Sequence, residues 1–202
     1  MDAHQPVMLP QVLAGLVPRA GGLYVDATFG RGGHAGAILD AAPGLRLHAF
    51  DRDPDAVAHA RQAFAGRPGF TMHHANFDAM GEILTAAGLG GQVDGVLMDL
   101  GVSSPQLDDP QRGFSFLRDG PLDMRMDPTR GEPVSDWLAR ASADEIADVL
   151  YLYGEERASR RIARAIVHDR VAEPFTRTVQ LAEMIARVMG GARGRIHPAT
   201  RS

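Results

Sequence analysis

The segment at residues 23–36, LYVDATFGRGGHAG, constrains the fold of this chain more than any other. It begins with apolar residues typical of strands, reaches an acid at Asp26, and passes through a glycine-rich run before a helical pattern begins at His34. A strand, a glycine-rich turn and a helix in this order form the first unit of a nucleotide-binding α/β fold. Glycine lets the backbone approach a ligand closely, and the N–H groups at the helix start can receive a carboxylate or a phosphate.

Three acids stand where predicted strands end. Asp26 ends the first strand, Asp51 ends LRLHAFD, and Asp99 ends VDGVLMD. Ligands of open α/β sheets bind at the carboxyl ends of the strands, so the three carboxylates are expected to line one crevice. An acid at the tip of the second strand suits a ribose diol. An acid within the glycine turn would repel a pyrophosphate, which favours the cationic S-adenosylmethionine over NAD as the ligand.

Alternating patterns after this segment predict a parallel sheet with right-handed crossovers. The strand at 93–99 is nearly all apolar, which predicts burial on both faces. Asp53 followed by Pro54 is typical of an N-cap and the first helical position. The expected elements are a short helix within 4–17, strands at 23–26, 45–51, 70–74 and 93–99, and helices at 53–65 and 76–87.

The alternation of strands and helices stops after Asp99. Residues 101–133 form a long connection rich in Gly, Pro and Asp, which is too long to be idle in a compact domain. Helical patterns follow, and Ser142 with Glu145 forms a capping box at the start of one of them. The predicted helices are 134–141, 142–153, 155–171 and 178–189.

Several sequence blocks resemble one family. DATFGRGGH, FDRDP, the long block from Asp94 to Gly131, YGEERASRRIARAI and HPATR are similar to the RsmH/MraW family of bacterial small-subunit rRNA cytosine-N4 methyltransferases, and the match runs from His4 to the end of the chain. The resemblance implies a class I, Rossmann-like α/β methyltransferase sheet. Residues 1–104 would form its S-adenosylmethionine-binding first part, residues 105–200 an inserted helical substrate-recognition domain, and residues 201–202 the start of the return to the sheet. Family members continue beyond HPATR, so we expect the last strands of the sheet to be missing from this chain.

The same resemblance implies the activity. The expected reaction transfers a methyl group from S-adenosylmethionine to the exocyclic N4 of a cytidine in 16S rRNA near the decoding centre, by direct in-line displacement. Carbon-5 methylation would need a thiolate nucleophile, and the sequence has no Cys. The expected partner is small-subunit rRNA or the assembled small subunit, in the cytoplasm; a homodimer is possible.

Several residues are candidates for binding the cofactor. The resemblance assigns cofactor contacts to Gly32, Gly33, His34, Phe77, Asp99 and Gln106. Asp51 is expected to accept hydrogen bonds from both ribose hydroxyls. Asp26 either holds the glycine turn or attracts the amino group of the methionine moiety, whereas Phe77 either packs on adenine or belongs to the core.

The catalytic candidates are Asp99 and Ser103. A cytosine amine is a poor nucleophile because its lone pair is delocalised into the ring, so an acceptor at its N–H protons would help the lone pair develop toward the methyl group. Asp99 is the candidate acceptor, assisted by the carbonyl of Leu100 or Gly101. The alternative role of Asp99, a contact to the cofactor without a catalytic part, is equally open. Ser103 either orients the base or caps the turn.

The substrate candidates lie in the second half of the chain. Asp119, Asp123 and Arg125 could read the Watson–Crick edge of a flipped cytidine. Trp137, the only Trp, either stacks on the target base or packs in the core. Four arginines repeat at helical spacing and either bind phosphates or pair within the helix with Glu156 and other acids; they are Arg157, Arg160, Arg161 and Arg164.

Charge and composition narrow the alternatives. The net charge of −4 conceals an asymmetry, since residues 155–202 carry 10 Arg against 5 acids, which favours an RNA-facing surface there. No apolar run is long enough for a membrane span, and no metal site is predicted, because His73 and His74 fall on opposite faces of a strand. Two other hypotheses remain. The Gly30-x-Gly32-x-x-Ala35 spacing permits an NAD-dependent oxidoreductase, and the basic C-terminal stretch permits a non-catalytic RNA-binding or assembly module.

Overall fold

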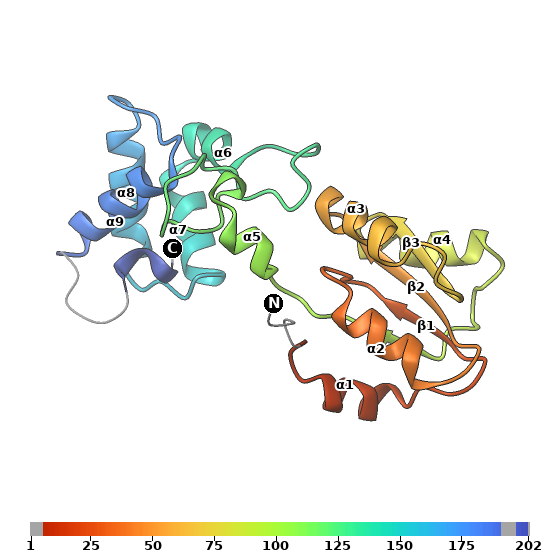
Figure 1. Cartoon of the computed structure of the whole chain (residues 1–202). Coiled ribbons are helices and arrows are strands. Elements are labelled where there is room, and N and C mark those ends of the chain that lie inside the picture. Colours follow the sequence, from red (N-terminus) through yellow and green to blue (C-terminus); the bar gives the residue numbers. More distant parts are fainter. Residues whose placement is uncertain (1–5, 191–196, 202) are drawn as a thin grey trace. The chain divides into compact units, whose positions relative to one another are not determined.

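The computed structural model describes residues 6–190 and 197–201. The chain divides into two compact units, with the boundary between Gly101 and Val102. Figure 1 shows the strands, among them β1, β2 and β3, in the first unit and a set of helices in the second. Over the described ranges, none of the helices combines the length and the apolar character that crossing a bilayer requires.

The first unit is a parallel α/β sheet, as the sequence predicts. Its strands are ordered β3-β2-β1-β4, and each neighbouring pair is parallel. The elements are α1 (Leu9–Leu16), β1 (Leu23–Asp26), α2 (Gly33–Ala41), β2 (Arg46–Asp51), α3 (Pro54–Ala63), β3 (Phe70–His74), the 3-10 turn η1 (Phe77–Ala79), α4 (Met80–Ala86) and β4 (Gly95–Leu97). This order and direction of strands confirm a Rossmann-like fold class.

The strand order contains a reversal that positions the candidate site. From β1 the chain adds β2 and β3 on one side, and then crosses back so that β4 pairs with the opposite side of β1. The sheet therefore extends from β1 in both directions, and the order of the strands reverses at β1. Doubly wound sheets bind their ligands at such a switch point, outside the carboxyl ends of the strands.

Side-chain alternation gives the sheet two covered faces. Tyr24 and Leu47 are register partners, so both point to one face. They are buried there with Ile38 of α2 and Ala60 of α3, and Leu13 of α1 packs against the same cluster. On the other face, the next residues along the strands meet α4 in a second cluster that contains Val25, Phe50 and Leu84.

The prediction that strand 93–99 is buried on both faces is wrong. β4 covers only Gly95–Leu97, and the exposed fractions of Val96 and Met98 are 42% and 43%. β4 is the edge strand of the described sheet, and its only strand partner there is β1. An apolar sequence indicates a tendency to be buried, but burial also needs a neighbour to cover the side chain.

The second unit is built on a helical core. Its elements are α5 (Ser104–Asp108), η2 (Pro110–Arg112), α6 (Val134–Arg140), α7 (Ala143–Leu152), α8 (Ser159–Asp169), α9 (Thr178–Val188) and η3 (Pro198–Arg201). Ile146, Ile162 and Ile185, from three different helices, are all buried in one cluster. The long connection therefore contains the short helix α5, and its remainder leads into the bundle.

Two helix starts test the sequence signals in the second unit. The predicted capping box before α7 is confirmed, because Ser142 N donates to Glu145 Oε2 at 2.7 Å and Glu145 N donates to Ser142 Oγ at 3.2 Å. The predicted start of α8 at residue 155 is wrong. Glu155 has φ +53, which interrupts the helix, and α8 begins only at Ser159.

A pair of matched substitutions tests the edge position of β4. Val96→Thr should change the free energy of unfolding by less than about 0.5 kcal/mol, because Val96 is already partly in water. Val25→Thr should cost about 1–3 kcal/mol, because it buries a hydroxyl in a fully covered position. Urea unfolding followed by circular dichroism measures both values, and equal losses would contradict the described edge.

Candidate functional site

The carboxyl group of Asp26 lies at the centre of the candidate site. Its exposed fraction is 1%, and Oδ1 accepts a hydrogen bond from Thr28 N at 3.1 Å. Oδ2 is also buried, and no described residue gives it a hydrogen bond. Burial raises the pKa of Asp26 to about 6, although the Thr28 N–H and nearby His34 oppose the rise. A buried carboxylate oxygen of this kind lacks a cationic or N–H partner.

The glycine turn next to Asp26 exists because side chains do not fit there. Gly32 has φ +75, and a Cβ on it would lie 2.6 Å from the ring of Phe29. A Cβ on Gly33 would lie 2.4 Å from Pro6 Cγ. Gly32 is also the N-cap of α2, and no side chain caps that helix start. The first N–H groups of α2 can therefore receive a ligand carboxylate or phosphate.

Asp51 links the tip of β2 to this turn. Its Oδ2 accepts from Gly30 N at 2.9 Å and its Oδ1 accepts from Asp53 N at 2.9 Å. Partial burial raises the pKa of Asp51, and the backbone N–H donors limit the rise. The backbone N–H of Arg52 also bonds this carboxylate, so both oxygens are held in place, and the four lone pairs of the carboxylate leave room for a further donor. Asp53 accepts from Asp55 N at 3.0 Å, which confirms its predicted role as the N-cap of α3.

His34 and Asp99 complete the group at the switch point. His34 is 8% exposed; its Nε2 lies 2.9 Å from Val7 O, and its Nδ1 lies 4.0 Å from Asp99 Oδ2. Asp99 N donates to Thr28 Oγ1 at 2.8 Å, which ties the end of β4 to the end of β1. The side chain of Asp99 is 55% exposed. The structure therefore turns the imidazole inward and leaves the carboxylate accessible.

The three predicted acids lie close enough to affect one another. The charges of Asp51 and Asp99 both raise the pKa of Asp26. The grouping of strand-end carboxylates is thus as the sequence predicts. Sequence reasoning missed Thr28, whose backbone N–H and hydroxyl contact two different acids. Its only signal in the sequence is its position two residues after a strand-end acid, a common place for an Asx turn.

Two further predictions in the first unit concern residues within and after β3. Phe77 begins η1, and its ring is 37% exposed rather than part of a described core cluster. Asn76 Oδ1 accepts from Phe77 N at 2.9 Å and fixes the start of this turn. His73 stacks on Phe50, with ring centroids 4.5 Å apart, and lies 2.9 Å from His48 through their ring nitrogens.

Ser103 and Gln106 belong to the second unit, at the start of α5. Ser103 is the N-cap of this helix, and Gln106 Oε1 accepts from Ser103 N at 2.9 Å. Gln106 is 5% exposed. The structure brings these two predicted site residues together in a helix cap, which favours the capping interpretation of Ser103. The cofactor contact of Gln106 stays a prediction.

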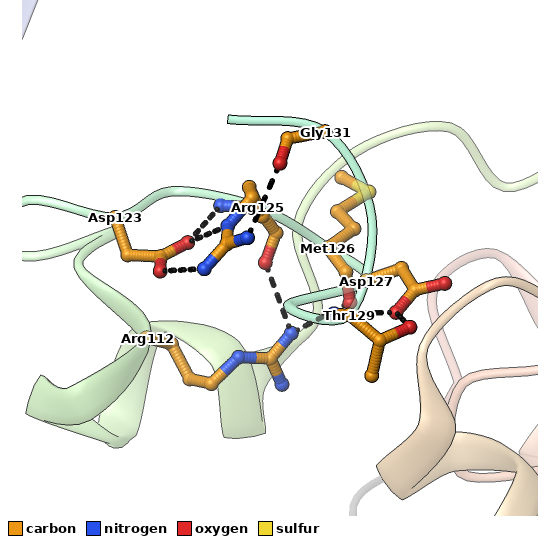
Figure 2. Close-up of polar contacts among 7 residues, drawn as sticks. All are labelled: Arg112, Asp123, Arg125, Met126, Asp127, Thr129 and Gly131. Carbon is orange, nitrogen blue, oxygen red and sulfur yellow. Dashed lines mark hydrogen bonds and ion pairs between the residues drawn. The ribbon is translucent and has the colours of Figure 1, made fainter. Parts of the chain in front are cut away.

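A polar network orders the predicted substrate loop, and Figure 2 shows its residues. Asp123 binds Arg125 through both oxygens, at 2.9 Å to Nε and 2.6 Å to Nη2, which lowers the pKa of Asp123 and raises that of Arg125. Arg112 Nη2 donates to Met126 O at 2.8 Å and to Arg125 O at 3.3 Å. No pattern in the sequence indicates that buried Arg112 holds this loop.

The other predicted substrate residues have structural partners of their own. Asp119 Oδ2 lies 2.7 Å from Arg177 Nε, and this hydrogen bond lowers the pKa of Asp119. Trp137 is partly buried against the helical core. These contacts support the core interpretation of Trp137, and a role for either residue in reading a base stays a prediction.

Replacement of Asp26 tests the raised pKa. The folded state holds the Asp26 proton up to about pH 6, whereas the ordinary value is 3.8, so the protein loses stability as pH rises from about 4 to about 6. Asp26→Asn removes this loss. The stability of the variant relative to the original protein should therefore rise by up to about 3 kcal/mol across that window, since one pKa unit corresponds to about 1.4 kcal/mol. Urea unfolding at several pH values measures the difference in free energy of unfolding between the two proteins. A difference that does not change with pH would contradict a raised pKa of Asp26.

Comparisons with known proteins agree with this arrangement. The model of the MraW methylase family matches residues 1–202. The chain is 55% identical to "Ribosomal RNA small subunit methyltransferase H" of Xanthomonas oryzae pv. oryzae, over 99% of the chain and 58% of that protein. It is also 55% identical to the protein of the same name from Xylella fastidiosa, over 98% of the chain and 64% of that protein. The chain thus spans about three fifths of the length of these relatives, and it belongs to the MraW methylase family.

Proposed function

We propose that this protein transfers a methyl group from S-adenosylmethionine to the exocyclic N4 of a cytidine in small-subunit (16S) rRNA near the decoding centre. The observation that carries the proposal is the buried Oδ2 of Asp26, which no described residue hydrogen-bonds, at the switch point of a methylase-family sheet. The names of the relatives support small-subunit rRNA as the substrate. N4 of cytidine, the decoding centre and in-line displacement come from the resemblance described above.

The residues of the first unit fit S-adenosylmethionine in charge and in hydrogen bonding. Asp26 Oδ2 would accept from the ammonium group, and the uncapped start of α2 at Gly33 and His34 would receive the carboxylate. Asp51, fixed by two backbone N–H groups, would accept from the ribose hydroxyls. The exposed ring of Phe77 would pack on adenine. Three acids at one sheet edge also attract a cationic ligand.

Asp99 is the proposed acceptor for the target amine. The bound cofactor would supply a methyl group on a sulfonium, which makes that carbon electrophilic. Asp99 has an accessible carboxylate on a backbone held by Thr28, so it can accept a hydrogen bond from the N4 amine without moving the strand end. Methylation of a neutral amine releases one proton, and the Asp99 carboxylate can take it. The carbonyl of Leu100 or Gly101 would accept from the second N–H.

The second unit is the proposed substrate-recognition domain. Asp123 holds the Arg125 guanidinium in a fixed orientation, so its remaining N–H edge could present a defined pattern to a base. Asp119, Ser103 and Trp137 are further proposed contacts of the target nucleotide. Small-subunit rRNA or the assembled small subunit is the proposed partner, which places the activity in the cytoplasm.

Calorimetric titration tests the cofactor. S-adenosylmethionine should bind and NAD should not, because an acid in the glycine turn repels a pyrophosphate. Asp51→Asn should weaken binding by about 10- to 100-fold, since hydrogen bonds to a charged group contribute about 1.5–3 kcal/mol. The matched control is Asp40→Asn on α2, where the side chain is 77% exposed and pairs with Arg67. Binding of NAD instead, or an equal loss in the control, would contradict the assignment.

Methyl transfer to small-subunit rRNA tests the role of Asp99. Asp99→Asn should lower kcat by about 100-fold or more at saturating cofactor, because the amide cannot take the proton. If Asp99 only contacts the cofactor, kcat would stay the same and only the cofactor KM would rise. Mass spectrometry of nucleosides from the product should find N4-methylated cytidine. Methylation at another position would overturn the N4 assignment, and no methylation by the unaltered protein would favour the non-catalytic module.

A further inference from the structure

The outer face of α8 carries a cluster of arginines. Arg160, Arg161 and Arg164 are exposed on the helix, and Arg157 is exposed just before it. The opposite side of α8 is buried in the helical core through Ile162, Ala163 and Ile166. At 100° per residue the three arginines of the helix fall within an arc of about 100°, so they share one face.

Several other arginines of the second unit have acidic partners, which the arginines of this face lack. The exposed side chains of Arg140, Arg177 and Arg187 each form an ion pair with an acid. By contrast, the side chains of Arg157, Arg160 and Arg164 form no hydrogen bond or ion pair with any described residue. The terminal nitrogen Nη2 of Arg161 contacts only the sulfur of Met189, at 3.3 Å. The positive charge of this face is therefore uncompensated in the described structure.

The alternative of pairing within the helix is not what the structure shows. Glu156 is 6% exposed, and its Oε1 accepts from Ala158 N at 2.7 Å. Its carboxylate is occupied by the turn before α8, so it is not an ion-pair partner of the arginines. Glu155 and Glu156 precede the cluster in the sequence, and Glu156 is the one that is buried in this way.

Exposed aromatic side chains lie at the end of α7, just before the turn that leads into this face. Tyr151 is 60% exposed and Tyr153 is 83% exposed, at the end of α7. The turn is fixed by the hydrogen bond from Glu156 N to Leu150 O at 3.0 Å, and Glu155 has φ +53 within it. Large aromatic rings in water lose hydrophobic stabilisation, so their exposure beside free cations calls for a partner that uses both.

We propose that these residues form a docking surface for single-stranded RNA; the α7–α8 surface consists of Tyr151, Tyr153, Arg157, Arg160, Arg161 and Arg164. Guanidinium groups without acidic neighbours complement a phosphate backbone, and exposed aromatic rings stack on unpaired bases. An apolar protein partner would not need four uncompensated cations. The surface contains no residue assigned above to the cofactor or the target base. It rests on the proposed function and extends it, because it gives an rRNA substrate a contact surface apart from the residues proposed for the target base.

Fluorescence anisotropy with a labelled 12-nucleotide single-stranded RNA tests the arginines. Arg160→Gln with Arg164→Gln should weaken binding about tenfold at 0.1 M salt, and should reduce the slope of log affinity against log salt by about 1.4, or about 0.7 per lost phosphate contact. The matched control is Arg140→Gln with Arg187→Gln, which removes the same charge from exposed but paired positions. The control should lose less than about threefold. Equal losses in the two double variants would overturn the proposal.

Tyrosine substitutions separate base stacking from charge. Tyr151→Leu with Tyr153→Leu keeps apolar side chains and the net charge, and should still weaken binding of the single strand by about tenfold or more. A duplex of the same length should bind more weakly and should not respond to the tyrosine change. No effect of the tyrosine change, or tighter binding to anionic vesicles than to RNA, would overturn the surface. Binding of S-adenosylmethionine should be intact in every variant; its absence in the unaltered protein would instead count against the proposed function.

Discussion

The structure of the candidate site depends on one buried carboxyl group, that of Asp26. It ends β1 at the point where the sheet reverses its order, and Thr28, two residues later, holds both Asp26 and the end of β4. The carboxylate of Asp51 fixes the glycine turn that follows, because it accepts a hydrogen bond from Gly30 N. A set of backbone N–H groups and acids is thus assembled around a single oxygen that lacks a partner among the described residues.

The buried and clustered acids of the candidate site lower the stability of the fold. Burial raises the pKa of Asp26 to about 6, and Asp51 and Asp99 add to the rise by repulsion. At neutral pH the charge of Asp26 therefore lowers the free energy of unfolding relative to a neutral side chain at this position. A cationic ligand relieves that repulsion, and an anionic ligand increases it. The proposed preference for S-adenosylmethionine over a dinucleotide rests on the same electrostatics that raise the pKa of Asp26.

Much of this site could be predicted from the sequence, because local patterns determine it. Strand-end acids at Asp26, Asp51 and Asp99 follow from apolar runs and parallel topology, and the cap at Asp53 follows from its place before Pro54. Whether β4 has a covering neighbour is not encoded in its own residues, so the burial of Val96 was predicted wrongly. The hydrogen bond from Arg112 to Met126 O joins residues fourteen positions apart in an irregular loop, and no periodic pattern in the sequence predicts it. The late start of α8 depends on the positive φ of Glu155, which charge patterns do not reveal.

Asp26 is the proposed partner of the ammonium group of the cofactor. Calorimetry at pH 5 to 8 can compare S-adenosylhomocysteine with 5′-methylthioadenosine, which keeps the nucleoside but lacks the ammonium and carboxylate groups. Protonation of Asp26 below about pH 6 removes the partner of the ammonium, so the affinity for S-adenosylhomocysteine should fall as pH drops through that value. The affinity for 5′-methylthioadenosine should not change there, and Asp26→Asn should remove the pH dependence. The same pH dependence for both ligands, or its persistence in the variant, would contradict the account.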